Sequence, residues 1–88
     1  MPSYLVESYV SAVEVDEARE RARRTAELGE DVRYVRTTFL PRDETILHLF
    51  EAPSASVLDE AGRRAALRFE RIVEAVDAGC DDPPDDTT

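Results

Sequence analysis

The stretch VRYVRTTFLPRDETILHLFEA, residues 32–52, decides the fold of this chain. Two runs within it, 32–40 and 44–52, are rich in the β-branched and aromatic residues that are typical of strands. The segment Pro41-Arg42-Asp43 lies between them and carries the proline expected near the start of a tight turn. The stretch therefore predicts a β-hairpin.

The two faces of this hairpin depend on the register of its strands. We expect Leu40 to pair with Glu44 across a three-residue loop. One face, which we predict to be the core, would then carry Val35, Thr37, Phe39, Leu47, Leu49 and Glu51. The other face, of mixed character, would carry Tyr34, Arg36, Thr38, Ile46, His48 and Phe50.

The segments on either side of the hairpin extend the pattern. Residues 4–10 have the composition of a first strand, and Asp16 can cap a helix to about Leu28 that Gly29 ends in the left-handed region. After Pro53, Ser54 can cap a second helix through about Ala66, and residues 69–76 supply a last strand.

The order strand, helix, strand, strand, helix, strand predicts an α+β fold of the ferredoxin-like βαββαβ type. In it a four-stranded antiparallel sheet carries both helices on one face. We assign residues 1–78 to this domain, and residues 79–88, which are acidic and lack apolar periodicity, to a disordered tail.

The second face of such a sheet is left open. Tyr34, Ile46 and Phe50 on that face would form an apolar patch in water, so we expect a homodimer through it, built as a dimeric α/β barrel. A monomer with a solvated face is the alternative, because Arg36 and His48 are polar.

The charge of the chain restricts its partners. It has 20 Asp and Glu against 11 basic residues, all of them arginine, and a formal net charge of −9. Nucleic acid and anionic membranes are disfavoured, because phosphate binding needs a concentrated basic surface. A lysine-free, acidic chain resembles proteins of halophiles, whose molar internal salt screens the self-repulsion. A genome rich in arginine codons is the alternative explanation for the missing lysine.

No targeting segment is evident in this sequence. The first residues lack the basic start and apolar run of a signal peptide, and no apolar stretch approaches the roughly 20 residues of a membrane span. We therefore expect a cytoplasmic protein.

Catalytic motifs are absent from the sequence. It has one histidine, His48, one cysteine, Cys80, and no glycine-rich phosphate loop, GxSxG or HExxH motif. The composition favours a binding protein over an enzyme, and we interpret Cys80 as incidental.

His48 lies in the middle of a predicted central strand and is the main candidate for chemistry. A packed core histidine is the commonest role at such a position, and a metal ligand or a proton-transfer group is the alternative. Glu7, on the other central strand, is the nearest candidate for a second metal ligand, unless it pairs with an arginine such as Arg36.

Four segments resemble a known family: Tyr4-Leu5-Val6-Glu7, Val32-Arg33-Tyr34-Val35, Phe50-Glu51-Ala52-Pro53-Ser54 and Arg71-Ile72-Val73-Glu74. Together they are similar to small bacterial and archaeal domains of unknown function that include a nickel-binding protein. The resemblance implies a dimeric ferredoxin-like fold. His48 stands where many relatives carry a cysteine, and histidine is also a nickel donor.

Two functions follow from these observations. The leading hypothesis is a small binding protein that holds nickel or another divalent metal through His48 and Glu7. The alternative, by analogy of fold, is a monooxygenase-like or isomerase-like enzyme of the dimeric α/β-barrel type. Its pocket would lie near His48 and would be lined by Tyr34, Arg36 and Phe50.

Overall fold

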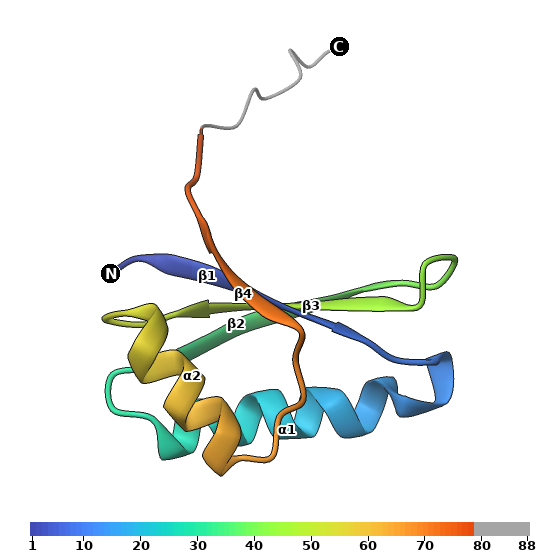
Figure 1. Ribbon diagram of the computed structural model, residues 1–88, viewed down its shortest axis with the longest axis horizontal. Helices are drawn as coiled ribbons and strands as arrows, with labels where there is room; N and C mark the ends of the chain where they lie inside the picture. The colour runs from blue at the N-terminus through green and yellow to red at the C-terminus, as the bar shows by residue number, and fades with distance from the viewer. Residues whose placement is uncertain (79–88) are drawn as a thin grey trace, which may run out of the picture.

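The computed structural model describes residues 1–78 and shows the predicted order of elements (Figure 1). The predicted tail, residues 79–88, lies outside the described residues. The elements are β1 (Ser3–Tyr9), a 3₁₀ turn (Ala12–Glu14), α1 (Val15–Leu28), β2 (Arg33–Leu40), β3 (Thr45–Glu51), α2 (Ala55–Arg64) and β4 (Arg71–Ala75).

The four strands form one antiparallel sheet in the order β2-β3-β1-β4. Strands β3 and β1 are therefore central, as the split βαβ arrangement predicts. Figure 1 shows both helices on the same side of the sheet, which leaves the other side open. The prediction of a ferredoxin-like α+β domain is confirmed.

Local capping explains where the helices begin. Before α1, Ser11 and Glu14 form a capping box around the 3₁₀ turn, so the helical segment starts earlier than a cap at Asp16 predicts. Ser54 caps α2 as predicted, because its Oγ accepts a hydrogen bond from the backbone N–H of Val57 at 3.2 Å.

Gly29 ends α1, but not in the left-handed region that the sequence predicts. Its φ is −93°, which any residue adopts. The space around it is what requires glycine: a Cβ there would lie 2.5 Å from Cγ2 of Val32 and 2.8 Å from Cβ of Ala61. Gly29 thus allows the end of α1 to pack against α2 and the start of β2.

The core lies between the sheet and the helices. Small residues on the helices, Ala22 on α1 and Ala61 on α2, are buried against larger side chains of the sheet. The buried apolar residues of the core cluster are Tyr4, Val6, Ala22, Val32, Phe50, Ala52, Leu58, Ala61 and Leu67.

The assignment of the two hairpin faces was right for Thr37 and Phe39, which lie on the helix-facing side, and wrong for the residues of β3. Phe50 and Ile46, which we expected on the open face, are fully buried on the helix-facing side, whereas Leu47 and Leu49 lie on the open side. Two features of the backbone explain the reversal. Leu40 pairs with Thr45 rather than Glu44, which shifts the register by one residue, and a bulge between Tyr34 and Arg36 shifts it again.

Among residues 1–78, no helix is both long enough and apolar enough to cross a membrane.

Candidate functional site

His48 occupies the centre of the helix-facing side of the sheet. It lies on β3 directly opposite Val6 of β1, and none of its surface is exposed to solvent. Burial penalises the charged imidazolium and lowers the pKa of His48 from 6.5 to about 4. The side chain is therefore neutral at pH 7.

A chain of hydrogen bonds from β2 fixes the ring of His48. The hydroxyl of Tyr34 lies 2.5 Å from Oγ1 of Thr37, which lies 2.8 Å from Nδ1 of His48. The bulge in β2 makes this possible, because it turns Tyr34 and Thr37, three residues apart, toward the same face.

The acidities of these groups indicate which of them donates in each hydrogen bond. A phenol is a stronger acid than an alcohol, so we assign Tyr34 as the donor to Thr37 and Thr37 as the donor to Nδ1 of His48. Nδ1 then accepts a hydrogen bond, and the single proton of the neutral ring lies on Nε2.

Nε2 of His48 has no hydrogen-bond partner. It is the one buried side-chain nitrogen or oxygen atom without a partner among residues 1–78. A buried donor in this state costs about 1–3 kcal/mol relative to a paired one, so native proteins rarely leave one unpaired. Because the two nitrogens of an imidazole point in divergent directions, Nε2 points away from Thr37 and from β2.

Two of the three predicted ligand-binding residues lie beside His48. The ring of Phe50 lies 6.4 Å from that of His48 and 5.6 Å from that of Tyr34, between centroids. These side chains form an aromatic wall on the helix-facing side. Arg36, the third predicted residue, is exposed and lies on the open face, because the bulge in β2 separates it from Tyr34.

The two predicted metal ligands, Glu7 and His48, do not meet. Glu7 pairs with Leu47 and so lies on the open face, where its Oε1 accepts a hydrogen bond from Nε of Arg71 at 2.5 Å. This pairing with an arginine is the alternative that the sequence left open, with Arg71 in place of Arg36, and it raises the pKa of Arg71. Strand alternation separates the two candidates, since Val6 and not Glu7 is opposite His48.

No group of three or more His, Cys, Asp or Glu side chains that could hold a metal ion exists among residues 1–78. The donor set around His48 therefore does not fit a nickel centre within one chain. Cys80 lies outside the described residues.

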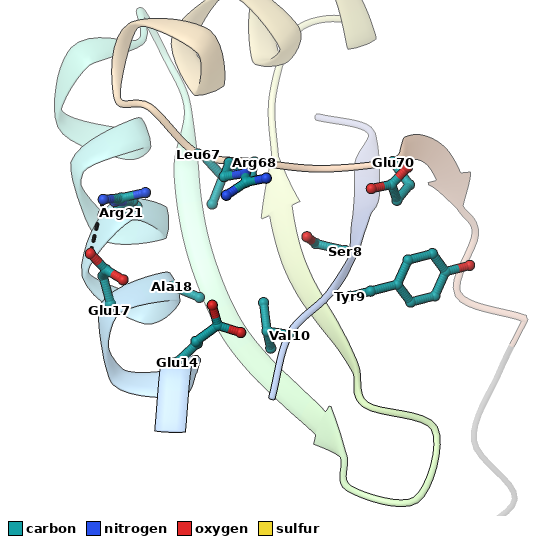
Figure 2. A pocket seen from close by; sticks show the side chains of 10 residues that line it. All are labelled: Ser8, Tyr9, Val10, Glu14, Glu17, Ala18, Arg21, Leu67, Arg68 and Glu70. Carbon is teal, nitrogen blue, oxygen red and sulfur yellow. Dashed lines mark hydrogen bonds and ion pairs between the residues drawn. The ribbon is translucent and has the colours of Figure 1, made fainter. Parts of the chain in front are cut away.

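A cleft opens between α1 and the end of β1 (Figure 2). Its volume is about 190 Å³. Ser8 and Ala18 face the space from opposite sides, whereas Tyr9 points to the other side of β1. The full lining is Ser8, Tyr9, Val10, Glu14, Glu17, Ala18, Arg21, Leu67, Arg68 and Glu70.

Ser8 lines the cleft and shares a face of the sheet with His48, which is not among the residues that line it. It pairs with Ile46 on β3, so His48 is its diagonal neighbour on the same face of the sheet. Diagonal neighbours in an antiparallel pair lie about 7–8 Å apart. We call Ser8, His48, Thr37 and Tyr34 the polar track, because these side chains form a line of polar groups across the helix-facing side of three strands.

The sequence analysis did not identify Ser8, Thr37 or Arg68. A signal for Ser8 was present, because Tyr4, Val6 and Ser8 alternate along β1 as buried residues. Thr37 depended on the bulge, and the position of Arg68 depends on the loop between α2 and β4, neither of which a local pattern reveals.

Comparisons with known proteins support the fold. No protein-family model matches the chain, and no curated protein matches it. The crystal structure of SCO4226 from Streptomyces coelicolor A3(2) is similar, with a TM-score of 0.70 and 20% sequence identity over 89% of this chain and 99% of that one. At this level of identity the similarity shows that the two chains share a fold.

Proposed function

We propose that this protein binds a small organic molecule between α1 and the sheet, with Nε2 of His48 as the polar anchor. The observation that carries the proposal is the fully buried Nε2 without a partner, on a ring that Thr37 and Tyr34 hold in place. The neutral ring presents an N–H group, so the ligand would offer a hydrogen-bond acceptor such as a carbonyl oxygen.

The surroundings of His48 support an organic ligand. Phe50 and Tyr34 provide aromatic contact area, and small side chains of α1 face the sheet above them. Ala18 lines the cleft, and Ala22, one turn further along α1, is buried in the core.

Binding of nickel or another divalent metal is the competing function, and it rests on the family resemblance. The geometry favours it less, because Glu7 is on the opposite face and a metal needs the lone pair of Nε2 rather than its proton. Coordination would require the hydrogen-bond chain through Thr37 to reverse.

We further propose that the protein works as a homodimer through the open face of the sheet. The apolar centre of this face consists of Leu5, Leu47, Leu49 and Val73, a different set from the one that the sequence predicted. Charges beside it are paired within the chain, as Glu7 with Arg71 and Arg33 with Glu51.

Internal pairing makes this face suitable for contact with a second copy. Two chains that each carry a net charge of −9 repel one another, and this repulsion is weakest where acids and bases balance. We place the dimer in the cytoplasm of a cell with high internal salt, where the remaining repulsion is screened.

The small-molecule proposal can be tested with 2-pentanone, a neutral hydrogen-bond acceptor, as the probe. In an NMR titration of the full-length protein in molar KCl, we expect saturable shifts centred on residues 4–8 and 46–50. His48→Leu should abolish them, because leucine fills the site without an N–H group.

Thr45→Val is the matched control, since Thr45 is also a buried polar residue of β3 but its hydroxyl bonds to the carbonyl of Asp43 at the hairpin loop. This variant should bind 2-pentanone like the wild type. Equal shifts in wild type and His48→Leu would refute the proposal. Saturable broadening around His48 by NiCl₂, with no response to 2-pentanone, would favour the metal function instead.

A further inference from the structure

The open side of the sheet carries a hollow, which we call the open-face groove. Its apolar lining comes from Leu5 of β1, Val35 of β2 and Leu49 of β3. Its volume is about 370 Å³, within the range of roughly 300–1,000 Å³ that encloses a drug-sized molecule. An occupant as large as a short stretch of polypeptide therefore fits in it.

The chain leaves the sheet beside this groove. Residues 76–78, which we call the β4 arm, follow β4 and rise in Figure 1 on the side of the sheet away from both helices. Val76, the first residue of the arm, lines the groove of its own chain and is still 78% exposed. The arm thus places an aliphatic side chain in solvent next to an apolar hollow.

Other exposed apolar side chains gather on the same side of the molecule. Tyr9, Leu40 and Val73 are among the exposed large hydrophobic residues, and each faces the open side by the alternation of its strand. Together with Val76 they make the open side the more apolar surface. Single exposed apolar residues are common, whereas a gathering on one face indicates a surface that another chain covers.

The groove also carries one base and one acid without a partner. Arg36 and Asp77 both line it, both are exposed, and neither belongs to an ion pair among residues 1–78. A contact across a two-fold axis occurs twice, because each copy presents the same surface. Arg36 of each copy can therefore pair with Asp77 of the other.

We propose that in the homodimer the β4 arm of each copy lies in the open-face groove of the other copy. Val76 would contact Leu5 and Leu49 there, and Asp77 would pair with Arg36. The inference rests on the proposed homodimer and adds the segment that joins the two copies. A face that carries both a hollow and a group to fill it is complementary to a second copy of itself.

Residues 79–88 are the other segment of the chain that follows the arm into this region. Their sequence offers acids to Arg36 in Asp81-Asp82 and Asp85-Asp86, but it has no Val, Leu, Ile, Met or aromatic residue. Such a segment lacks the aliphatic side chains that an apolar lining buries favourably. The composition therefore favours Val76 of a second copy as the occupant.

Val76→Ser tests the apolar contact. It should weaken dimerisation of the full-length protein at least 10-fold in molar KCl, as measured by sedimentation equilibrium, because valine loses a buried position. Val13→Ser is the matched control, since Val13 is even more exposed but lies in the 3₁₀ turn that leads into α1. This variant should dimerise like the wild type.

Arg36→Glu tests the charged contact. It should weaken dimerisation about 5-fold even in molar KCl, because the Debye length of about 3 Å leaves charges in direct contact only partly screened. Adding Asp77→Arg to the same chain should restore the affinity. Arg24→Glu, at an exposed arginine of α1, changes the net charge equally and is the control. A double variant as weak as Arg36→Glu would show that the two residues do not meet.

Isotope-filtered NOE spectra locate the arm directly. Copies labelled with ¹³C are unfolded and refolded together with unlabelled copies, so that the filtered spectra report only contacts between copies. We expect NOEs from the methyl groups of Val76 to those of Leu5 and Leu49.

The outcomes separate this inference from the proposal on which it rests. A dimer without these NOEs, in which Val76→Ser behaves like Val13→Ser, would show that the arm does not join the copies, although the homodimer stands. NOEs to Leu5 and Leu49 from residues 79–88 of the same copy would show that the groove holds its own tail, and would also overturn the inference. A protein that stays monomeric would refute both proposals.

Discussion

The two faces of the sheet differ in kind although the same strands build both. The helix-facing side is covered by the two helices and contains the polar track, with a buried nitrogen that lacks a partner among residues 1–78. The open side has an apolar centre, and four of its charged groups form two ion pairs, Glu7 with Arg71 and Arg33 with Glu51. We propose a different role for each face: ligand binding on the helix-facing side and contact with a second chain on the open side.

Neighbouring residues of β3 show how sharp this division is. His48 and Phe50 are wholly buried among aromatic and small side chains. Leu47 and Leu49, which alternate with them along β3, face outward and are only partly buried. A single strand thus contributes to both tasks through its two-residue alternation.

The largest expected effect contrasts Phe50→Ala with Leu49→Ala. Removing the fully buried ring should cost about 3–5 kcal/mol of unfolding free energy, because it leaves a cavity in the core. Leu49→Ala should cost less than about 1.5 kcal/mol when the dimer is dissociated, since its side chain is then partly exposed. Urea unfolding at low protein concentration measures both, and similar losses would contradict the assignment of faces.

The next effect concerns pH and the helix-facing side. The folded protein holds His48 with a pKa of about 4 rather than 6.5, so the unfolded chain binds a proton in this range that the folded one does not. Stability should therefore fall as the pH drops from about 6.5 to 4, by up to about 3 kcal/mol, and should lose no more on this account below pH 4.

His48→Gln isolates this contribution, because glutamine does not titrate and the carboxylates are common to both proteins. The difference in unfolding free energy between wild type and variant, measured in urea at pH 7 and pH 4, should shrink by this amount. A constant difference across that range would mean that the folded state also accepts the proton on His48.

A third prediction addresses the open face. Leu49→Glu would place an unpaired charge at the centre of the proposed interface and should weaken dimerisation at least 100-fold. Light scattering after gel filtration in molar KCl should then give about the monomer mass of 9.9 kDa for the variant and twice that mass for the wild type. Ser56→Glu, an exposed change on α2 on the other side of the sheet, is the control and should dimerise normally. A wild type that stays monomeric would refute this part of the account.

The smallest effect belongs to the hydrogen-bond chain. Thr37→Val removes the donor to Nδ1 of His48 and leaves a second unpaired nitrogen, which should cost about 1–2 kcal/mol. Thr38→Val, at the next position but on the open face, should change stability by less than about 0.5 kcal/mol. Thermal unfolding compares the two variants. Equal shifts of Tm would show that the hydrogen bond from Thr37 to His48 contributes nothing to stability.

Much of the fold could be predicted from the sequence, because it is encoded locally. Alternation, turn residues and the cap at Ser54 gave the order of the elements and the central position of β1 and β3. The faces could not be predicted, because residues 46–50 are apolar on both sides of His48 and the register depends on a bulge in the partner strand.

The candidate site could be predicted only in part from the sequence. His48, Tyr34 and Phe50 were identified as candidates and lie together, although the structure places them on the face opposite to the expected one. The bulge in β2 separates Arg36 from His48, and the pairing of β1 with β3 places Val6 rather than Glu7 opposite His48. Sites assembled from several strands depend on register, and register is a tertiary property.

The most direct test of the central claim is the position of the proton on His48. Long-range ¹H–¹⁵N NMR at pH 7 should show a neutral ring that is protonated at Nε2 and unprotonated at Nδ1, and the Nε2 resonance should move when 2-pentanone is added. A ring that is protonated at Nδ1, or an Nε2 resonance that 2-pentanone does not change, would contradict the account. Protonation at Nδ1 would also leave the lone pair of Nε2 free for a metal ion.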